Sequence, residues 1–147
     1  MEEIVTDFSN ETAQVLLKEY FADWVRQLDM SFEKMTDQGA RFRWAATPGL
    51  LRGADEGRPG VVCGQATSAV ADTLSVLTLC ALNEGFRDCT TADLHINFLR
   101  PLFDGEIEVD VTALSNGRRS ATTRVEFRQS GSGKLAATAT VAFIYLA

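Results

Sequence analysis

The sequence is poor in the side chains that bind metals and form disulfides. Its 147 residues include one histidine, His95, and three cysteines, an odd number without Cys-x-x-Cys spacing. Zinc sites draw their ligands from histidine and cysteine, so no metal is expected. Disulfide scaffolds need paired cysteines and an oxidising compartment. The sequence therefore predicts a metal-free protein of a reducing, cytoplasmic compartment.

Positive charge is also scarce. Fourteen Lys and Arg residues stand against twenty Asp and Glu residues, which gives a net charge of −6 and a pI near 4.8. A general nucleic-acid binder presents a basic surface, so no nucleic-acid partner is expected. The chain begins Met-Glu-Glu-Ile-Val, which is acidic where a signal or transit peptide is basic. We therefore expect no targeting segment.

One long stretch has almost no charge of either sign. Between Val61 and Asn83 the only charged residue is Asp72. A run of this length can cross a membrane. Its content argues against a span, because it contains Gln65, several Thr and Ser residues and a carboxylate, and it has no basic flank. We expect instead a central helix at about residues 63–83, buried on all sides, and no membrane partner.

The rest of the chain predicts one helix and several strands. Ser9 is a candidate N-cap for a helix at about residues 9–28. Its apolar stripe consists of Leu16, Leu17, Tyr20, Phe21, Trp24, Val25 and Leu28. Residues 30–44 predict two short strands. Alternating residues from 88 to 146 predict a four-stranded antiparallel meander with a hairpin at Asn116-Gly117.

This order of elements predicts a fold class. A long helix that is apolar all round needs a cover broader than another helix, and a curved antiparallel sheet provides one. We therefore expect an α+β hotdog fold, in which the sheet wraps the long central helix, with an extra N-terminal helix. At this length the whole chain, 1–147, is expected to form a single domain.

Three features at the central helix can carry chemistry. Gly64 falls in the first turn, where unpaired backbone N–H groups can stabilise the oxyanion of an attacked thioester or ester; alternatively, the glycine only permits a tight entry. Asp72 suits a general base or nucleophile, or is a structural carboxylate satisfied by Thr73, Ser68 or a neighbouring strand. Thr90 and Thr91 begin the next strand, where a hydroxyl can orient a water or Asp72, although threonine favours strands in any case.

From about residue 57 to residue 145 the sequence resembles the PaaI-type acyl-CoA thioesterases of the hotdog superfamily. The segment 91–101 is the most specific part of the likeness. The matching segments read R-P-G-x-x-x-G at 58–64, Asp72 on the helix, T-A-D-L-H-I-N-F-L-R-P at 91–101, G-E-I at 105–107 and G-R-R at 117–119.

The resemblance implies hydrolysis of an acyl-CoA thioester to free acid and CoA. Coenzyme A then enters only as part of the substrate, and no other cofactor is expected. By the same resemblance, Asp72 is the nucleophile or general base. The N–H of Gly64 polarises the thioester carbonyl, and Thr91 positions the water or the carboxylate.

Two features depart from the family pattern. The commonest motif, His-Gly-Gly, is replaced by Cys63-Gly64-Gln65, and a subgroup with a small Ser in the first position is more similar. We expect Cys63 and Gln65 to line the substrate site. The loop asparagine that holds water in many members is replaced by Gly57 or Arg58.

Helix geometry implies a second copy of the chain. Gly64 and Asp72 are eight residues apart, which is about 12 Å along one helix. One thioester carbonyl cannot meet both groups from one chain, whereas two antiparallel central helices related by a dyad bring them together. We therefore expect a homodimer with sites at the interface. The resemblance further implies a dimer of dimers.

Arg118 and Arg119 follow the predicted hairpin turn, where they can meet the phosphates of coenzyme A or remain solvated surface charges. Two rival functions stay open. The first is a non-catalytic module that binds acyl-CoA, which gains nothing from the free-energy cost of placing the Asp72 carboxylate in an apolar helix. A cysteine enzyme based on Cys63 lacks an evident base. We expect His95 to be structural, and no other histidine is present for dehydratase chemistry.

Overall fold

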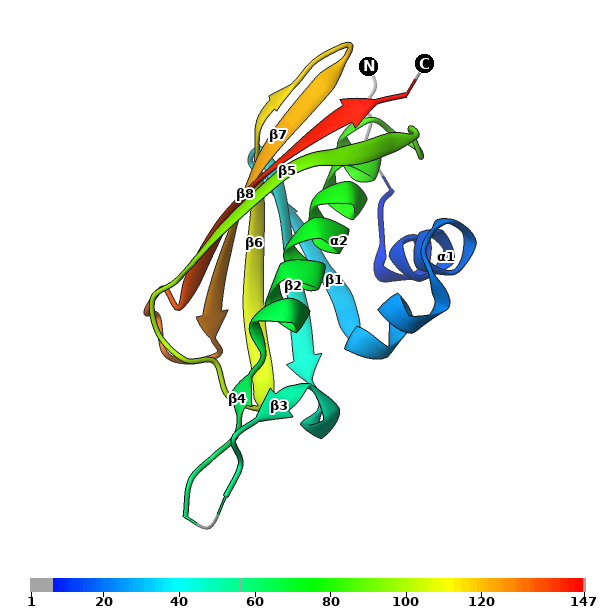
Figure 1. Ribbon diagram of the computed structural model, residues 1–147. Coiled ribbons are helices and arrows are strands. Elements are labelled where there is room, and N and C mark those ends of the chain that lie inside the picture. The colour runs from blue at the N-terminus through cyan, green and yellow to red at the C-terminus, as the bar shows by residue number, and fades with distance from the viewer. Residues whose placement is uncertain (1–6, 56, 147) are drawn as a thin grey trace.

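The structure, a computed structural model, describes residues 7–55 and 57–146; the acidic first five residues lie outside this range. A six-stranded antiparallel sheet curves round one long helix, α2 (Gly64–Leu82), which confirms the predicted hotdog architecture (Figure 1). The sheet order is β1-β2-β6-β7-β8-β5. The strands are β1 (Met30–Thr36), β2 (Gly39–Ala46), β5 (Cys89–Phe98), β6 (Gly105–Asn116), β7 (Ser120–Gln129) and β8 (Ala137–Tyr145).

The inner face of the sheet forms one apolar core with α2. Along β6, Ile107, Val109 and Val111 are buried and the residues between them are more exposed, as expected when only one face of a sheet is covered. The largest fully buried side chains from the sheet and helix are Trp44, Phe42, Phe127, Phe143, Leu74 and Leu77. Truncation of a core Phe costs about 3–5 kcal/mol. This core fixes the sheet against the helix.

The central helix is not buried on all sides, which corrects the expectation from its composition. Two hydroxyls on its covered side are hydrogen-bonded: Ser75 shares a 2.7 Å hydrogen bond with Thr123, and Thr78 donates to the carbonyl of Leu74 at 2.8 Å. The sheet and the N-terminal segment cover only part of its circumference. The side left partly exposed, here called the open stripe, consists of Gln65, Ser68, Ala69, Asp72 and Val76.

Among the described residues, α2 is the one helix long and apolar enough to cross a membrane. However, 67% of its most apolar window is buried within the protein. Its apolar side chains thus serve the core, in agreement with the interpretation of residues 63–83 as a central helix.

The N-terminal helix begins where the sequence predicts. Ser9 is the N-cap of α1 (Asn10–Tyr20), and its side chain accepts a hydrogen bond from the backbone N–H of Thr12 at 3.2 Å. Ala13 and Leu17 form the buried side of this helix, which packs against β1. The cap and the apolar spacing were therefore sufficient signals for its start.

The predicted continuation of this helix to residue 28 is wrong. The backbone becomes extended at Phe21 and Ala22, and a separate 3₁₀ helix, η1 (Asp23–Leu28), follows. The break allows the buried side chains of η1, Val25 and Leu28, to pack in the core near α2. Tyr20 and Trp24, which belong to the predicted apolar stripe, are left about half exposed.

The predicted meander is correct for β6, β7 and β8 and wrong for β5. β5 pairs with β8, whereas β6 pairs with β2. Alternation records which face of a strand is buried and not which strand lies beside it, so the sequence could not reveal this order. As a result β5 is an edge strand, next to α2.

The chain enters α2 through a short irregular segment. A 3₁₀ turn, η2 (Pro48–Leu50), is followed by a two-stranded ribbon of β3 (Leu51–Arg52) and β4 (Val61–Val62). The Val62 N–H donates to the carbonyl of Leu102, and the Cys63 N–H donates to that of Leu50. These bonds fix the direction in which the helix begins.

Candidate active site

The centre of the open stripe carries a paired carboxylate. The hydroxyl Oγ1 of Thr91, on β5, donates to Oδ1 of Asp72, in the middle of α2, at 2.6 Å. Among the residues that the structure describes, Asp72 has no other hydrogen-bond or ion-pair partner, so its second oxygen remains available. Asp72 is partly exposed, so a substrate on this face can reach it. The expected proximity of a strand hydroxyl to Asp72 is confirmed for Thr91.

A β-bulge turns Thr91 toward the helix. Leu94 lies opposite Val141, a buried residue of β8, so it belongs to the inner face. Strict alternation would place Thr91, three residues earlier, on the outer face. The pairing register shifts between Thr91 and Asp93, so that Thr91 lies opposite buried Phe143 and also faces inward. Without this bulge the hydroxyl would point away from Asp72.

Gly64 is the first residue of α2, as predicted. Its N-cap, Cys63, makes no side-chain hydrogen bond to the helix. The N–H groups of the first turn that lack an acceptor therefore remain available at the positive end of the helix dipole. A Cβ at Gly64 would lie 3.2 Å from Cζ of Phe98, so the absence of a side chain also lets this ring pack over the helix start. The two interpretations of Gly64, a donor to an oxyanion and a residue that permits tight packing at the helix start, thus both have a physical basis.

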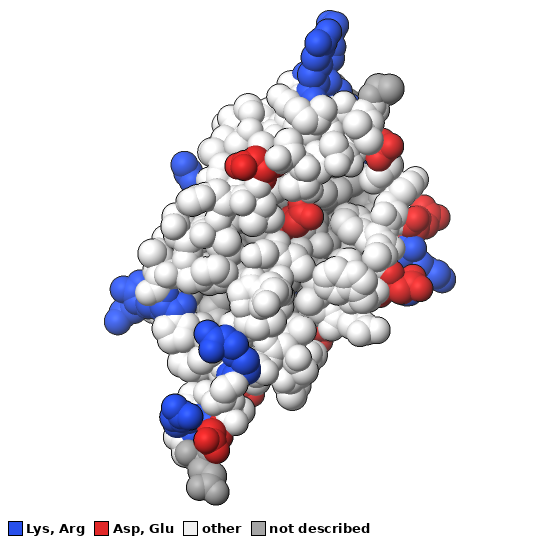
Figure 2. Space-filling model, in the orientation of Figure 1, with Lys and Arg blue, Asp and Glu red and all other residues white. Residues whose placement is uncertain are grey.

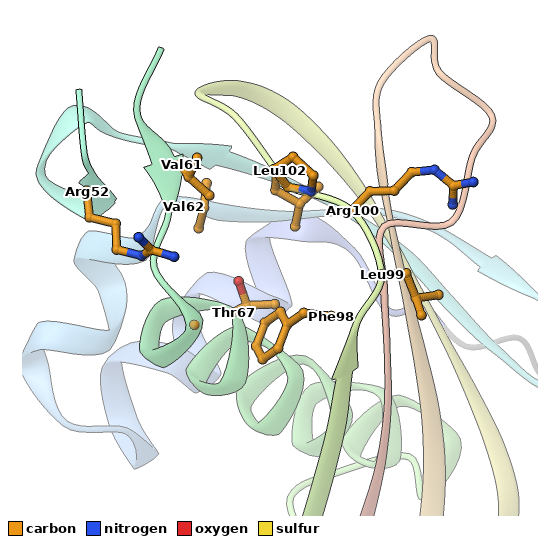
Figure 3. Close-up of a pocket in the computed structure, with 10 residues that line it drawn as sticks. Arg52, Val61, Val62, Thr67, Phe98, Leu99, Arg100 and Leu102 are labelled. Carbon is orange, nitrogen blue, oxygen red and sulfur yellow. The ribbon is translucent and has the colours of Figure 1, made fainter. Parts of the chain in front are cut away.

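A cleft of about 460 Å³ opens beside Gly64. The Phe98 ring and the Thr67 side chain lie over the start of α2, and Arg52 extends from β3 toward them (Figure 3). Arg100, on the far side, points away and donates to the carbonyl of Leu135 at 2.7 Å. The cleft is therefore apolar around the helix start, with one cation at its margin.

A second cleft, of about 430 Å³, lies on the other side of the same helix start. Cys63 and Gln65 line it together with Trp24, Leu28 and Leu50. The two residues predicted to contact substrate thus flank Gly64 but line a different cavity. Both cavities contribute apolar walls next to the free backbone N–H groups.

The remaining predicted residues are far from the helix start. Asp72 lies about 12 Å further along α2 than Gly64, at 1.5 Å per residue, so one chain does not bring these two together. Arg118 and Arg119 lie in the β6–β7 turn, which Figure 1 places near the C-terminal end of α2. The face that includes α2 and β5 has few charges, and most of its Lys and Arg side chains lie toward its margins (Figure 2).

Cys80, Cys89 and the histidine give no support to cysteine chemistry. Burial raises the pKa of Cys80 to about 11, and burial together with the negative charges of Asp88 and Asp72 raises the pKa of Cys89. His95 lies opposite exposed Thr140, on the outer face of β5, so its imidazole points away from the helix.

Sequence reasoning missed Arg52, Phe98 and Trp24. Arg52 and Trp24 carry no motif, and they reach the helix start only because β3 and η1 fold back on it. Phe98 was recognised as part of an alternating strand. The packing of its ring on Gly64 depends on β5 lying next to α2.

Comparisons with known proteins agree with this architecture. The family model of the acyl-CoA thioesterase N-terminal domain matches residues 59–144, more than half of the chain. A conserved protein of Pseudomonas aeruginosa is 25% identical, with a TM-score of 0.71 over 88% of this chain and 98% of that one. No match was found among curated proteins.

Two further solved structures show the same fold. A thioesterase of Haemophilus influenzae is 19% identical, with a TM-score of 0.78 over 95% of this chain and 91% of its own. Zebrafish thioesterase superfamily member 2 is 16% identical, with a TM-score of 0.75 over 96% of this chain and all of its own. The family match and the helix wrapped by a curved sheet show that this chain belongs to the acyl-CoA thioesterase family and has the hotdog fold.

Proposed function

We propose that the protein hydrolyses an acyl-CoA thioester to the free acid and CoA, as a PaaI-type enzyme. The observation that carries the proposal is the 2.6 Å hydrogen bond from Thr91 to Asp72, in the middle of the open stripe. A carboxylate held in one orientation, with one oxygen available, suits a group that accepts a proton or attacks a carbonyl.

In the general-base form of the reaction, Asp72 accepts a proton from water as the oxygen attacks the thioester carbonyl. A backbone N–H at Gly64 donates to the oxyanion that forms, and the intermediate then expels the thiolate of CoA, which takes up a proton. In the nucleophilic form, an oxygen of Asp72 attacks first, expels the thiolate, and forms a mixed anhydride that water hydrolyses. Thr91 orients the carboxylate in both forms.

The proposed site needs a second copy of the chain. Gly64 and Asp72 are about 12 Å apart in one chain, and the stripe between them is left open. Two copies packed with antiparallel α2 helices would cover both stripes and place Gly64 of each chain by Asp72 of the other. The proposed partner is therefore an identical chain, in a homodimer with two sites. In the proposed dimer of dimers, the two dimers would pair through other surfaces.

Coenzyme A would be recognised at its phosphates by Arg118 and Arg119. Both side chains are exposed, and within the described part of the chain neither has an ion-pair partner. Guanidinium groups bind phosphate through paired N–H donors. The turn that carries them lies toward the C-terminal end of α2, about 15 Å beyond Asp72 at 1.5 Å per residue, a separation suited to the extended pantetheine arm.

The test is hydrolysis of a panel of acyl-CoA thioesters, from short-chain to aromatic, followed by release of free thiol. We expect turnover of at least one member and its loss in Asp72→Asn. Tight binding of acyl-CoA without turnover would instead support the non-catalytic binding module. Loss of turnover in Cys63→Ser with retention in Asp72→Asn would support the cysteine enzyme.

A further inference from the structure

The turn that carries Arg118 and Arg119 is held by a side chain from another part of the fold. Arg87, in the segment between α2 and β5, donates through Nη1 to the carbonyl of Gly117 at 3.2 Å and through Nη2 to that of Arg118. Both acceptors are backbone groups of the β6–β7 turn. The guanidinium group therefore fixes the backbone of the turn and leaves the Arg118 and Arg119 side chains exposed.

Arg87 is itself held in place by the Tyr145 ring. Its guanidinium carbon lies 3.6 Å from the centroid of the Tyr145 ring, a cation–π arrangement. The Tyr145 hydroxyl donates to Asn116 Oδ1 at 2.6 Å and accepts from Asn83 Nδ2 at 2.9 Å. Asn116 Nδ2 in turn donates to Asn83 Oδ1 at 2.9 Å, which closes a ring of three hydrogen bonds.

This cluster joins four elements at one end of the molecule. Asn83 is the C-cap of α2, Asn116 ends β6, Tyr145 ends β8, and Arg87 precedes β5. The backbone N–H of Tyr145 also donates to the carbonyl of Arg119 at 2.9 Å. A surface turn can close with far fewer contacts. The number and direction of these bonds indicate that the backbone conformation of the turn is important for more than closing the hairpin.

We propose that Arg87 is a positioning residue for coenzyme A: it preorganises the turn so that Arg118 and Arg119 meet the phosphates of the substrate. This inference rests on the proposed function and adds a residue that touches neither the substrate nor the reacting atoms. A turn whose backbone is already ordered loses less entropy on binding, so the clamp lowers KM for substrates with the nucleotide and leaves the chemical step unchanged.

The experiment compares two thioesters of the same acyl group, one on CoA and one on pantetheine, which lacks the nucleotide and its phosphates. In Arg87→Ala, KM for the CoA thioester should rise about three- to tenfold, with kcat and the KM of the pantetheine thioester within twofold of the original. The dependence of the CoA thioester's KM on salt should also weaken. Arg124→Ala removes an exposed arginine of β7 that has no ion-pair partner among the described residues, and it is the matched control for loss of charge.

The double variant Arg118→Ala/Arg119→Ala separates this inference from the proposal beneath it. It should raise KM for the CoA thioester at least as much, and adding Arg87→Ala should raise it little further, because the residues act as one unit. If the double variant raises KM and Arg87→Ala does not, the inference is overturned and phosphate binding stands. If the double variant has no effect although acyl-CoA is hydrolysed, the phosphate site and this inference both fail while the proposed hydrolysis stands. If the protein hydrolyses no acyl-CoA, the proposed function itself fails, and the inference fails with it.

Arg87→Lys covers the case in which Arg87→Ala does not fold. Lysine keeps the charge and the stem over Tyr145 but cannot donate to two carbonyls as a planar fork. We expect a rise in KM for the CoA thioester of about two- to threefold, selective for that substrate. An equal rise for both thioesters would indicate a general structural defect and would overturn the inference.

Discussion

At its β1 edge the sheet is closed by side chains of α1, whereas at its β5 edge no described side chain bonds to the strand backbone. Asn10 Oδ1 accepts from the N–H of Phe32 at 2.9 Å, and Gln14 Nε2 donates to the carbonyl of Met30 at 2.9 Å. β5, in contrast, is exposed along most of its length. An uncovered edge strand is a template for pairing with another chain, and proteins normally block such edges.

The proposed homodimer would account for this difference, because its partner could pair with the β5 edge. It lies beside the open stripe of α2 and carries the hydroxyl that orients Asp72. Phe98 and Leu99, at the end of β5, expose about half of their surface (53% and 54%). An edge, an apolar margin and a functional carboxylate on one face fit the proposed homodimer better than an isolated chain.

The largest effect is expected at the centre of the open stripe of α2, beside the β5 edge. Asp72→Asn keeps the shape of the side chain and its contact with Thr91 but removes the base, so kcat should fall by about 10²–10⁴. The measurement is thiol release from the best substrate of the panel. Asp93→Asn, on the outer face of β5, is the matched control and should change kcat by less than twofold. Activity of Asp72→Asn within a few-fold of the original would remove Asp72 from the reaction.

A mixed dimer tests whether Gly64 of one chain and Asp72 of the other form one active site. One chain carries Gly64→Pro and the other Asp72→Asn. Proline fits the first position of a helix, and Cys63, at ψ 149°, already has the extended conformation that a residue before proline prefers. The proline lacks the N–H, and loss of one oxyanion donor costs about 10²–10³. Each homodimer should therefore be nearly inactive.

Reassortment of equal amounts makes about half of the dimers mixed, each with one intact site of two, so about a quarter of the original activity should return. Sedimentation and circular dichroism must first show that Gly64→Pro is a folded dimer, because a Cβ at position 64 would lie 3.2 Å from Cζ of Phe98. Subunit exchange without recovery would show that Gly64 and Asp72 do not share a site across an interface.

A smaller effect is expected from the strand hydroxyl. Thr91→Val removes the hydrogen bond to Asp72 and keeps the shape, so kcat should fall about tenfold while KM stays unchanged, and Thr91→Ser should restore most of the rate. Thr90→Val is the matched control, since Thr90 lies opposite exposed Ile144 on the outer face. Equal losses at both positions would mean that the hydroxyl contributes only to the strand.

This pair of threonines also shows how far the sequence could predict the site. Composition and spacing were enough to identify the helix, to place Gly64 in its first turn and to single out the carboxylate of Asp72. The regular alternation of residues 93–98 gives no sign of the bulge that turns Thr91 inward. The pairing of β5 with β8 and the open side of α2 depend on contacts between distant segments, which no local pattern records. The same holds for Arg87 and the turn it clamps.

The smallest effect is expected at the closed edge. Asn10→Ala removes the acceptor for the Phe32 N–H, and this N–H can then bond to water because the contact is exposed. The free energy of unfolding should therefore fall by only about 0.5–1.5 kcal/mol, measured by urea denaturation, with kcat and KM unchanged. Glu19→Ala, at an exposed position of the same helix, is the control for loss of a surface side chain, because helix propensity is similar for Glu and Ala. If Asn10→Ala lowers activity or shifts the dimer equilibrium as much as stability, the β1 edge also contributes to assembly and the contrast between the two edges does not hold.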